Sequence, residues 1–129
     1  MLIVDDAAMN LLALRCILSS LGVNCDEATD GNEAIEHATR RIHSDLHFYK
    51  LILMDFAMPD CDGPTAAAAI LKLLKEHRPS EPPVLICCVT AYTTDDFRKT
   101  ALDSGMKHFF TKPVKSGCIE ALLQEVGLR

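Results

Sequence analysis

Five residues that could take part in chemistry stand directly after short apolar runs. They are Asp5, Asp6, Asp55, Thr90 and Lys112. The runs that precede them are residues 2–4, 51–54, 84–89 and 108–111. Apolar runs of this length, bounded by turn residues, are typical of strands buried on both faces of a parallel sheet. Because the carboxyl ends of such strands share one edge, we expect these side chains to lie together there.

Three carboxylates, a hydroxyl and an ammonium group are suited to phosphoryl transfer. Two carboxylates about 5 Å apart repel each other by ~3 kcal/mol at an effective dielectric near 20, so the group needs a cation or a proton. Oxygen ligands favour a hard ion such as Mg²⁺, which also binds water and phosphate oxygens. Asp55 beside Mg²⁺ and Lys112 could attack a phosphoryl group and become an acyl phosphate. Thr90 could then donate a hydrogen bond to the phosphate.

Each of these residues also has an ordinary structural interpretation. Asp55 could cap the following loop, since aspartate is common in turns, and Asp6 could cap the first helix. Thr90 could be an ordinary residue at a strand end, and Phe109 could be a core residue of its strand. Lys112 is the hardest to explain in this way, because a lysine that follows an apolar strand needs an acidic partner.

The patterns between these residues predict five strands that alternate with five helices. The expected strands are residues 2–4, 23–28, 51–55, 84–89 and 108–111. Helices are expected at 9–21, at 32–41, from the cap Asp62 to His77, from the cap Thr93 or Thr94 to Asp103, and at 116–128. Residues 43–50 are expected to form a loop. This alternation predicts an α/β fold, with a doubly wound parallel five-stranded sheet and helices on both faces.

The first helix carries apolar residues on two sides. One set at helical spacing is predicted to face the core: Met9, Leu12, Ala13, Cys16 and Ile17. A second set lies roughly opposite: Leu11, Leu14 and Leu18. We expect this second set either to pack against the last helix or to form an exposed partner-binding patch beside Asp55. Inward residues predicted in the second and last helices are Ala34, Ile35, Ala38, Ile119, Leu122, Leu123 and Val126.

The composition indicates one domain, residues 1–129, that folds alone. A chain of this length buries about two-thirds of its unfolded surface. The net charge of −5 argues against a general nucleic-acid-binding surface. The sequence contains no apolar window long enough for a membrane span and no signal-peptide pattern. The six cysteines form no C-x-x-C pair, so most are predicted to be reduced core thiols of a cytoplasmic protein, and the five histidines are predicted to lie on the surface.

Four motifs, in this order, resemble the receiver domain of two-component response regulators. The motifs are Ile3-Val4-Asp5-Asp6, residues 54–63 around Asp55, Thr90-Ala91, and Phe109-Phe110-Thr111-Lys112-Pro113. Together they extend from the first strand to the last. Asn10 and residues 28–34 are most similar to the receivers of hybrid histidine kinases. The resemblance implies a flavodoxin-like (βα)5 fold.

The resemblance also implies roles for individual residues. Asp55 would accept a phosphoryl group from the phosphohistidine of a histidine kinase or a histidine phosphotransfer protein. The implied Mg²⁺ ligands are Asp5, Asp6, Asp55 and the backbone carbonyl of Ala57. Thr90 and Lys112 would sense the phosphate, and Phe109 would turn inward when Thr90 moves. The domain would be a cytoplasmic monomer or weak dimer that catalyses only its own phosphorylation and dephosphorylation, without direct contact with nucleic acid or membrane.

The sequence departs from the family pattern in three places, and two other functions remain open. The first strand lacks its usual leading residues, residues 76–83 form a longer and more proline-rich loop, and Ala57 and Tyr92 flank the site at positions that bear on phosphoryl lifetime. The chain could be a degenerate receiver that only binds partners. It could also be a phosphatase that uses Asp55 on the same type of sheet, although haloacid-dehalogenase-type phosphatases usually carry a second aspartate where Ala57 stands.

Overall fold

A parallel sheet with the strand order β2-β1-β3-β4-β5 forms the centre of the molecule. The computed structural model describes residues 1–91 and 94–129, and within them the strands are β1 (Leu2–Val4), β2 (Asp26–Ala28), β3 (Leu51–Asp55), β4 (Leu85–Thr90) and β5 (Lys107–Thr111). The helices are α1 (Ala8–Ser20), α2 (Gly31–Ile42), α3 (Gly63–His77), α4 (Asp95–Asp103) and α5 (Ser116–Glu125). The predicted doubly wound, flavodoxin-like fold is confirmed.

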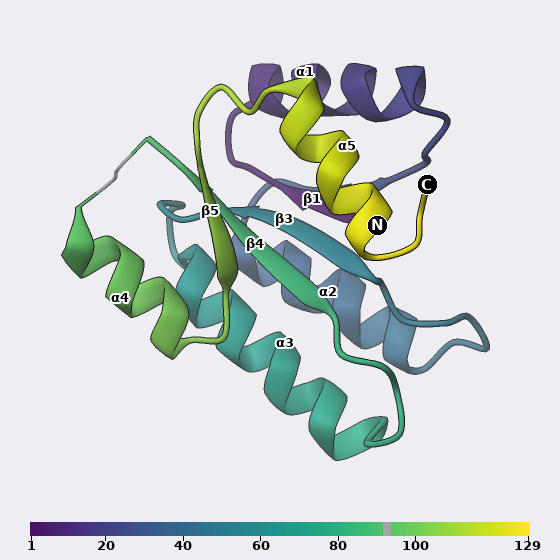
Figure 1. The fold of residues 1–129 in the computed structure, drawn as a ribbon. Coiled ribbons are helices and arrows are strands. Elements are labelled where there is room, and N and C mark those ends of the chain that lie inside the picture. The colour runs from purple at the N-terminus through teal and green to yellow at the C-terminus, as the bar shows by residue number, and fades with distance from the viewer. Residues whose placement is uncertain (92–93) are drawn as a thin grey trace.

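The helices cover the sheet on both faces, as Figure 1 shows. Helices α1 and α5 lie on one face, and α2, α3 and α4 lie on the other. Each face has its own apolar cluster, and alternate residues of a strand contribute to opposite clusters: Cys87 and Val89 to the α1/α5 side, Ile86 and Cys88 to the other. None of the helices in the described part of the chain is long and apolar enough to cross a membrane.

Strand β3 is buried along its whole length and presents Asp55 at its carboxyl end. Its register brings Met54 beside Val4 of β1, and Asp55 beside Val89 of β4. The backbone N–H of Gly63 donates a hydrogen bond to the carbonyl of Phe56 at 2.8 Å, which closes the loop after the strand. A Cβ atom at Gly63 would collide with the carbonyl oxygen of Asp55, so only glycine permits this close return of the chain.

The predicted start of the third helix is confirmed. The side chain of Asp62 accepts a hydrogen bond from the backbone N–H of Thr65 at 2.9 Å, and Pro64 lies in the first turn. Thr94 occupies the N-cap position of α4, but among the described residues its side chain forms no capping hydrogen bond. The alternative cap, Thr93, lies outside the described residues.

Two elements are shorter than predicted because the chain reverses at a helix end. The N–H of Val23 donates to the carbonyl of Leu18 at 2.9 Å, so Val23 completes the end of α1 and does not join β2. Helix α5 ends before Gly127, whose φ of 76° turns the backbone. The N–H of Leu128 then donates to the carbonyl of Leu123 at 2.8 Å. Both are closing bonds of the kind that satisfies the last carbonyls of a helix.

The prediction for the faces of α1 is wrong, because the two faces are reversed. The core-facing set is Leu11, Leu14 and Leu18, which are buried with α5 in the α1/α5 cluster. Of the set predicted to be inward, Met9 is 75% exposed and Leu12 43% exposed, Ala13 and Cys16 are exposed, and Ile17 is half-buried. The expectation that the leucines pack beside the last helix is therefore confirmed, and the exposed apolar surface is formed by the other set.

The segment at residues 43–50 is a loop, as predicted, but it is firmly attached to the core. Phe48 and Tyr49 are buried. The guanidinium group of Arg78, at the end of α3, donates hydrogen bonds to four carbonyl oxygens of this region: Arg41, Ile42, Ser44 and Leu46. Glu81 accepts from the N–H of Phe48 at 2.9 Å and lies 3.6 Å from Arg78. The proline-rich segment after α3 therefore holds the loop in place.

The remaining expectations about burial are largely confirmed. Buried inward residues of α2 and α5 are Ala34, Ala38, Ile119, Leu122 and Leu123, while Ile35 and Val126 are half-buried.

All six cysteines are free thiols, but only Cys61, Cys87 and Cys88 are buried. Burial raises the pKa of Cys87 and Cys88 to about 12, so both remain protonated at neutral pH. His37 is half-buried, and the other four histidines are exposed.

The observed orientation of α1 predicts that truncating two leucines of this helix lowers the free energy of unfolding by different amounts. Leu18→Ala should lower the free energy of unfolding by about 2–5 kcal/mol, because it removes a fully buried side chain and leaves a cavity. Leu12→Ala, the matched control, should change it by less than about 0.5 kcal/mol. Urea denaturation followed by circular dichroism measures both values. A larger loss for Leu12→Ala than for Leu18→Ala would contradict the orientation.

Candidate functional site

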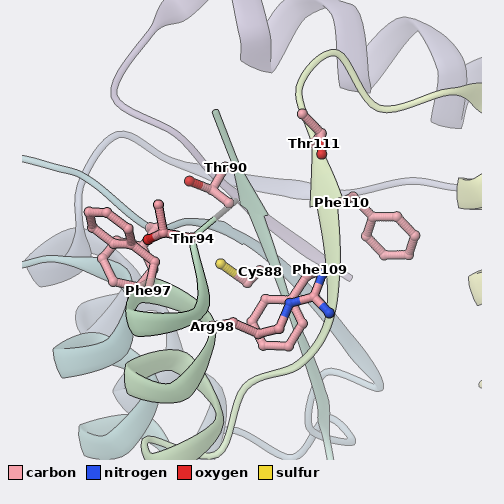
Figure 2. A pocket seen from close by; sticks show the side chains of 9 residues that line it. Cys88, Thr90, Thr94, Phe97, Arg98, Phe109, Phe110 and Thr111 are labelled. Atoms are coloured by element: carbon pink, nitrogen blue, oxygen red, sulfur yellow. The ribbon is translucent and has the colours of Figure 1, made fainter. Parts of the chain in front are cut away.

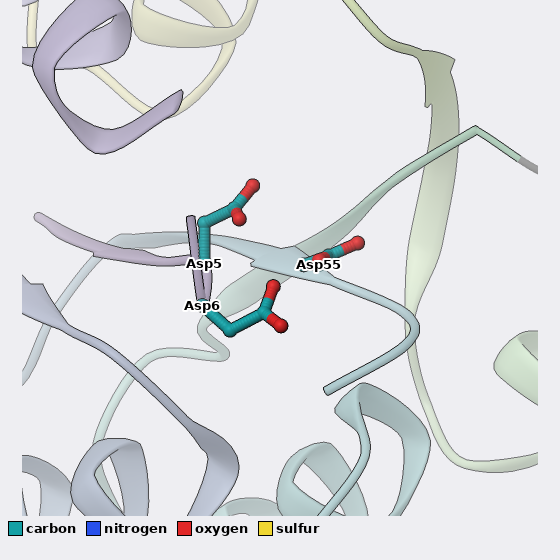
Figure 3. Close-up of side chains that lie close together, drawn as sticks. All are labelled: Asp5, Asp6 and Asp55. Atoms are coloured by element: carbon teal, nitrogen blue, oxygen red, sulfur yellow. The ribbon is translucent and has the colours of Figure 1, made fainter. Parts of the chain in front are cut away.

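Three carboxylates meet at the carboxyl edge of the sheet. Asp5 and Asp6 follow β1, and Asp55 ends β3 (Figure 3). One oxygen atom of each lies within 4.8 Å of the others. Asp5 and Asp55 are buried and Asp6 is exposed, so the cluster opens to solvent on the side of Asp6. The expectation that the strand ends bring these acids together is confirmed.

Lys112 connects two of these carboxylates. Its Nζ atom lies 2.8 Å from Oδ2 of Asp5 and 3.0 Å from Oδ2 of Asp55. The lysine follows β5, and its backbone N–H donates to the carbonyl of Thr90 at 3.0 Å, which fixes the end of β5 against the end of β4. The predicted acidic partner of Lys112 is therefore a pair of buried aspartates from two other strands.

The interpretation of Asp6 as the cap of the first helix does not hold. Ala7, not Asp6, occupies the N-cap position of α1, and Asp62 caps α3. Asp5 instead organises the turn into α1, because its Oδ1 atom accepts from the N–H of Ala7 at 2.9 Å. Asp5 Oδ2 also accepts from Nδ2 of Asn10 at 3.2 Å, which gives that asparagine a place beside the site.

Burial and charge act in opposite directions on the pKa of Asp55. Removal from water raises the pKa of this carboxyl above its usual 3.8, and the neighbouring charges of Asp5 and Asp6 raise it further. The hydrogen bond and charge of Lys112 oppose this effect without cancelling it. Burial alone would lower the pKa of Lys112, but its hydrogen bonds and ion pairs with Asp5 and Asp55 outweigh that effect and raise it. Lys112 is therefore a permanent cation at neutral pH.

The other predicted site residues lie around this cluster. Thr90 is buried at the end of β4, one residue beyond the Val89 that pairs with Asp55. Ala57 is exposed in the loop after β3. Phe109 is half-buried and, with Thr90, lines a small cavity between β4, α4 and β5 (Figure 2). Tyr92 lies outside the described residues.

One residue of this region was not identified from the sequence. The guanidinium carbon of Arg98 lies 5.2 Å from the centre of the Phe109 ring. The sequence offered no signal for it, because the contact joins the fourth residue of α4 to a residue of β5.

The acidic cluster is compatible with Mg²⁺. The ion takes oxygen ligands at about 2.0–2.1 Å in an octahedral arrangement, so ligand oxygens on one ion lie roughly 3–4 Å apart. The three carboxylates, with oxygens within 4.8 Å of one another, need only a small contraction or one water-mediated contact to satisfy this spacing. Mg²⁺ usually retains several waters, and the exposure of Asp6 leaves room for them.

The ion pairs of Lys112 lead to a pH-dependent prediction for metal-free protein. Lys112→Ala should lower the free energy of unfolding at pH 7 by about 1–3 kcal/mol, because it leaves two buried carboxylates without their hydrogen-bonded cation. Lys115→Ala, an exposed lysine nearby, is the control and should change it little.

The loss in Lys112→Ala should shrink as the pH falls. Without the ammonium, the folded-state pKa of Asp55 rises further above its unfolded value of 3.8. Such a carboxyl destabilises the fold fully above its folded pKa, and the penalty disappears as the pH falls toward the unfolded value. Urea denaturation in EDTA from pH 7 to pH 4 measures this trend, and a loss that grows at lower pH would contradict the assignment.

Comparisons with known proteins agree with this geometry. A family model, the response regulator receiver domain, matches residues 1–124. Hybrid signal transduction histidine kinase K of Dictyostelium discoideum is 33% identical over 114 residues, which are 87% of this chain and 9% of that kinase. The chain therefore spans less than a tenth of the length of that relative.

Two solved structures combine sequence similarity with a similar fold. One is a co-crystal structure of the Saccharomyces cerevisiae histidine phosphotransfer signaling protein Ypd1 and the receiver domain of its downstream response regulator Ssk1, with 30% identity, a TM-score of 0.83, and coverage of 98% of this chain and 87% of that one. The other is the receiver domain of a sensor histidine kinase from Pseudomonas aeruginosa, with a magnesium ion coordinated in the active site cleft. Its identity is 28%, its TM-score is 0.78, and the match covers 98% of this chain and 95% of that one. With its fold, its acidic cluster and a family match along nearly its whole length, this chain belongs to the response regulator receiver domain family of two-component phosphorelay signalling.

Proposed function

We propose that this chain, as one receiver domain of residues 1–129, accepts a phosphoryl group from a phosphohistidine onto Asp55 with Mg²⁺ bound at the acidic cluster. The observation that carries the proposal is the bridge of Lys112 between Asp5 and Asp55 at the shared edge of the sheet. The bridge supports the proposal because a buried carboxylate that could act as the nucleophile lies in contact with a cation, which also contacts a second acid that could bind the metal. The donor would be a histidine kinase or a histidine phosphotransfer protein, the latter by similarity to the receiver that was solved with Ypd1.

In the transfer step, an oxygen of the Asp55 carboxylate attacks the phosphorus atom. A P–O bond forms as the P–N bond to the imidazole breaks, and the bonding electron pair leaves with the histidine. Lys112 neutralises charge on the oxygens of the transferred group, and the Thr90 hydroxyl donates a hydrogen bond to one of them. Asp5, Asp6 and Asp55, with the carbonyl of Ala57, would hold Mg²⁺, which supplies further neutralisation when bound.

Two competing functions are less well supported. A degenerate receiver that only binds partners would not need all of the acidic, hydroxyl and lysine positions to be filled, as they are here. A phosphatase of the haloacid dehalogenase type would need an acid two residues after Asp55, and Ala57 cannot act as one. Family members are signalling modules, and we propose that this domain catalyses only its own phosphorylation and dephosphorylation.

Labelling with acetyl phosphate tests the nucleophile and the metal together. In the presence of Mg²⁺, the parent should gain one phosphoryl group by intact mass, whereas Asp55→Asn should gain none because its amide is not a nucleophile. EDTA should abolish labelling of the parent. Asp6→Asn should raise the Mg²⁺ concentration needed for half-maximal labelling severalfold, since it removes one charged ligand.

Three results have different meanings in this assay. A label that persists in Asp55→Asn would overturn the assignment of the nucleophile. No label on a folded parent would favour the degenerate receiver. Continuous release of phosphate without an accumulating acyl phosphate would favour the phosphatase.

We infer that the phosphohistidine partner docks on the exposed side of α1. The apolar residues there are Met9, Leu12, Ala13 and Cys16. Beside them, a cavity of about 50 Å³ lies between α1 and the segment after β5, and both Asp5 and Lys112 line it. A partner helix on this surface would reach the site edge from the side of α1. Exposed apolar residues next to a reactive site are typical of a protein-binding surface.

Leu12→Glu should separate docking from chemistry. The side chain is 43% exposed and lies outside the core clusters, so the free energy of unfolding and acetyl-phosphate labelling should change little. Transfer from a phosphorylated histidine phosphotransfer protein should slow severalfold, because a charge replaces an apolar contact. Leu46→Glu, a substitution of another exposed leucine far along the chain, is the control and should leave transfer unchanged. Equal transfer rates for parent and Leu12→Glu would remove α1 from the docking surface.

A further inference from the structure

The cavity between β4, α4 and β5 is too small for an aromatic ring. It is lined by Phe56, Cys88, Thr90, Thr94, Phe97, Arg98, Phe109, Phe110 and Thr111, and its volume is about 20 Å³. That volume accommodates one water molecule, but a phenyl ring needs several times more space. Phe97 partly fills the region and contacts Phe56 edge-on, with the ring centres 4.9 Å apart. The Phe109 ring forms part of the wall of this cavity (Figure 2).

Arg98 covers the Phe109 ring from the side of α4. Its guanidinium carbon is 5.2 Å from the ring centre, within the range of a cation–π contact (Figure 2). Phe109 packs against the apolar cluster on the face of the sheet that α2, α3 and α4 cover. Phe110 packs against the cluster on the other face, under α1 and α5. The ring of Phe109 is thus held between the sheet on one side and Arg98 on the other.

The cation–π contact of the Arg98 side chain links it to β5 and not to its own helix. None of the ion pairs among the described residues involves Arg98, although Asp95 and Asp96 lie in the same turn. The side chain instead extends across to β5, where it reaches Phe109.

We propose that Arg98 is a positioning residue that holds the Phe109 ring in its place at the cavity wall and so sets how readily the domain responds to a phosphoryl group at Asp55. This inference rests on the proposed function. If a movement of Thr90 toward the phosphate enlarges the cavity and Phe109 then enters it, the contact with Arg98 stabilises only the state that precedes this movement. A ligand that binds preferentially to the state with Phe109 inward must then overcome the free energy of this contact. Its apparent affinity falls by the factor by which the contact shifts the equilibrium away from that state.

Titration with beryllofluoride and Mg²⁺, followed by ¹⁹F NMR, tests this proposal. Arg98→Ala should bind beryllofluoride more tightly than the parent by roughly two- to fivefold, the factor that corresponds to an exposed cation–π contact. The direction is informative, because loss of a positive charge alone would weaken binding of an anionic ligand. Lys99→Ala, the adjacent exposed lysine, is the matched charge control and should bind slightly more weakly or unchanged. Arg98→Lys keeps the charge without the planar guanidinium group and should lie between the parent and Arg98→Ala.

A double-mutant cycle separates the contact from other effects of Arg98. In the Phe109→Leu background, Arg98→Ala should no longer increase affinity, because the ring that Arg98 covers is absent. In ligand-free Arg98→Ala, the ring signals of Phe109 should shift part of the way toward their beryllofluoride-bound positions. Unchanged or weaker binding by Arg98→Ala would overturn the role of Arg98, as would an equal gain in the Phe109→Leu background. A parent that binds no beryllofluoride would overturn the proposed function itself.

Discussion

The bridge of Lys112 between Asp5 and Asp55 is the interaction on which the site depends. Its three residues come from the two ends and the middle of the chain, and they meet only because the strands are parallel and end at one edge. Strand β4 lies between β3 and β5, so the lysine must reach across the end of β4. The hydrogen bond from the N–H of Lys112 to the carbonyl of Thr90 fixes the backbone position from which the lysine side chain extends. A shift in the register of β5 would separate the cation from both acids.

The same interaction explains how a fold can tolerate buried carboxylates. Burial alone disfavours the charged form of Asp55, and two neighbouring aspartates add to the penalty. One ammonium group cannot neutralise three carboxylates, which is consistent with the proposed binding of a further cation at the cluster. Such an uncompensated group is expected at a functional site and would be a defect elsewhere in a core. The unfavourable electrostatics and the proposed metal site are therefore two aspects of one arrangement.

The sheet and its acidic edge could be predicted because their signals are local. A buried strand such as β3 is an uninterrupted apolar run, and the residue after it must lie at the sheet edge. The faces of α1 could not be predicted in this way, because Leu12 and Leu14 lie on different sides of a helix that is apolar on both. The choice depends on where α5 packs, which is a contact between the two ends of the chain. The attachment of residues 43–50 was unforeseen for the same reason, since Arg78 binds carbonyl oxygens more than thirty positions away.

Strand β4 connects the two sides of the sheet at the site. Val89 pairs with Asp55 and belongs to the cluster under α1 and α5, whereas Cys88 and Thr90 line the cavity beside Phe109 on the α4 side. Successive residues of a strand point to opposite faces of the sheet. A movement of β4 near Asp55 would therefore displace side chains on both faces. The proposed partner surface on α1 and the Arg98–Phe109 contact on α4 therefore lie on opposite faces of the sheet. A phosphohistidine partner on α1 would thus leave the proposed switch region on the α4 side free, and the residues at the end of β4 contribute to both faces.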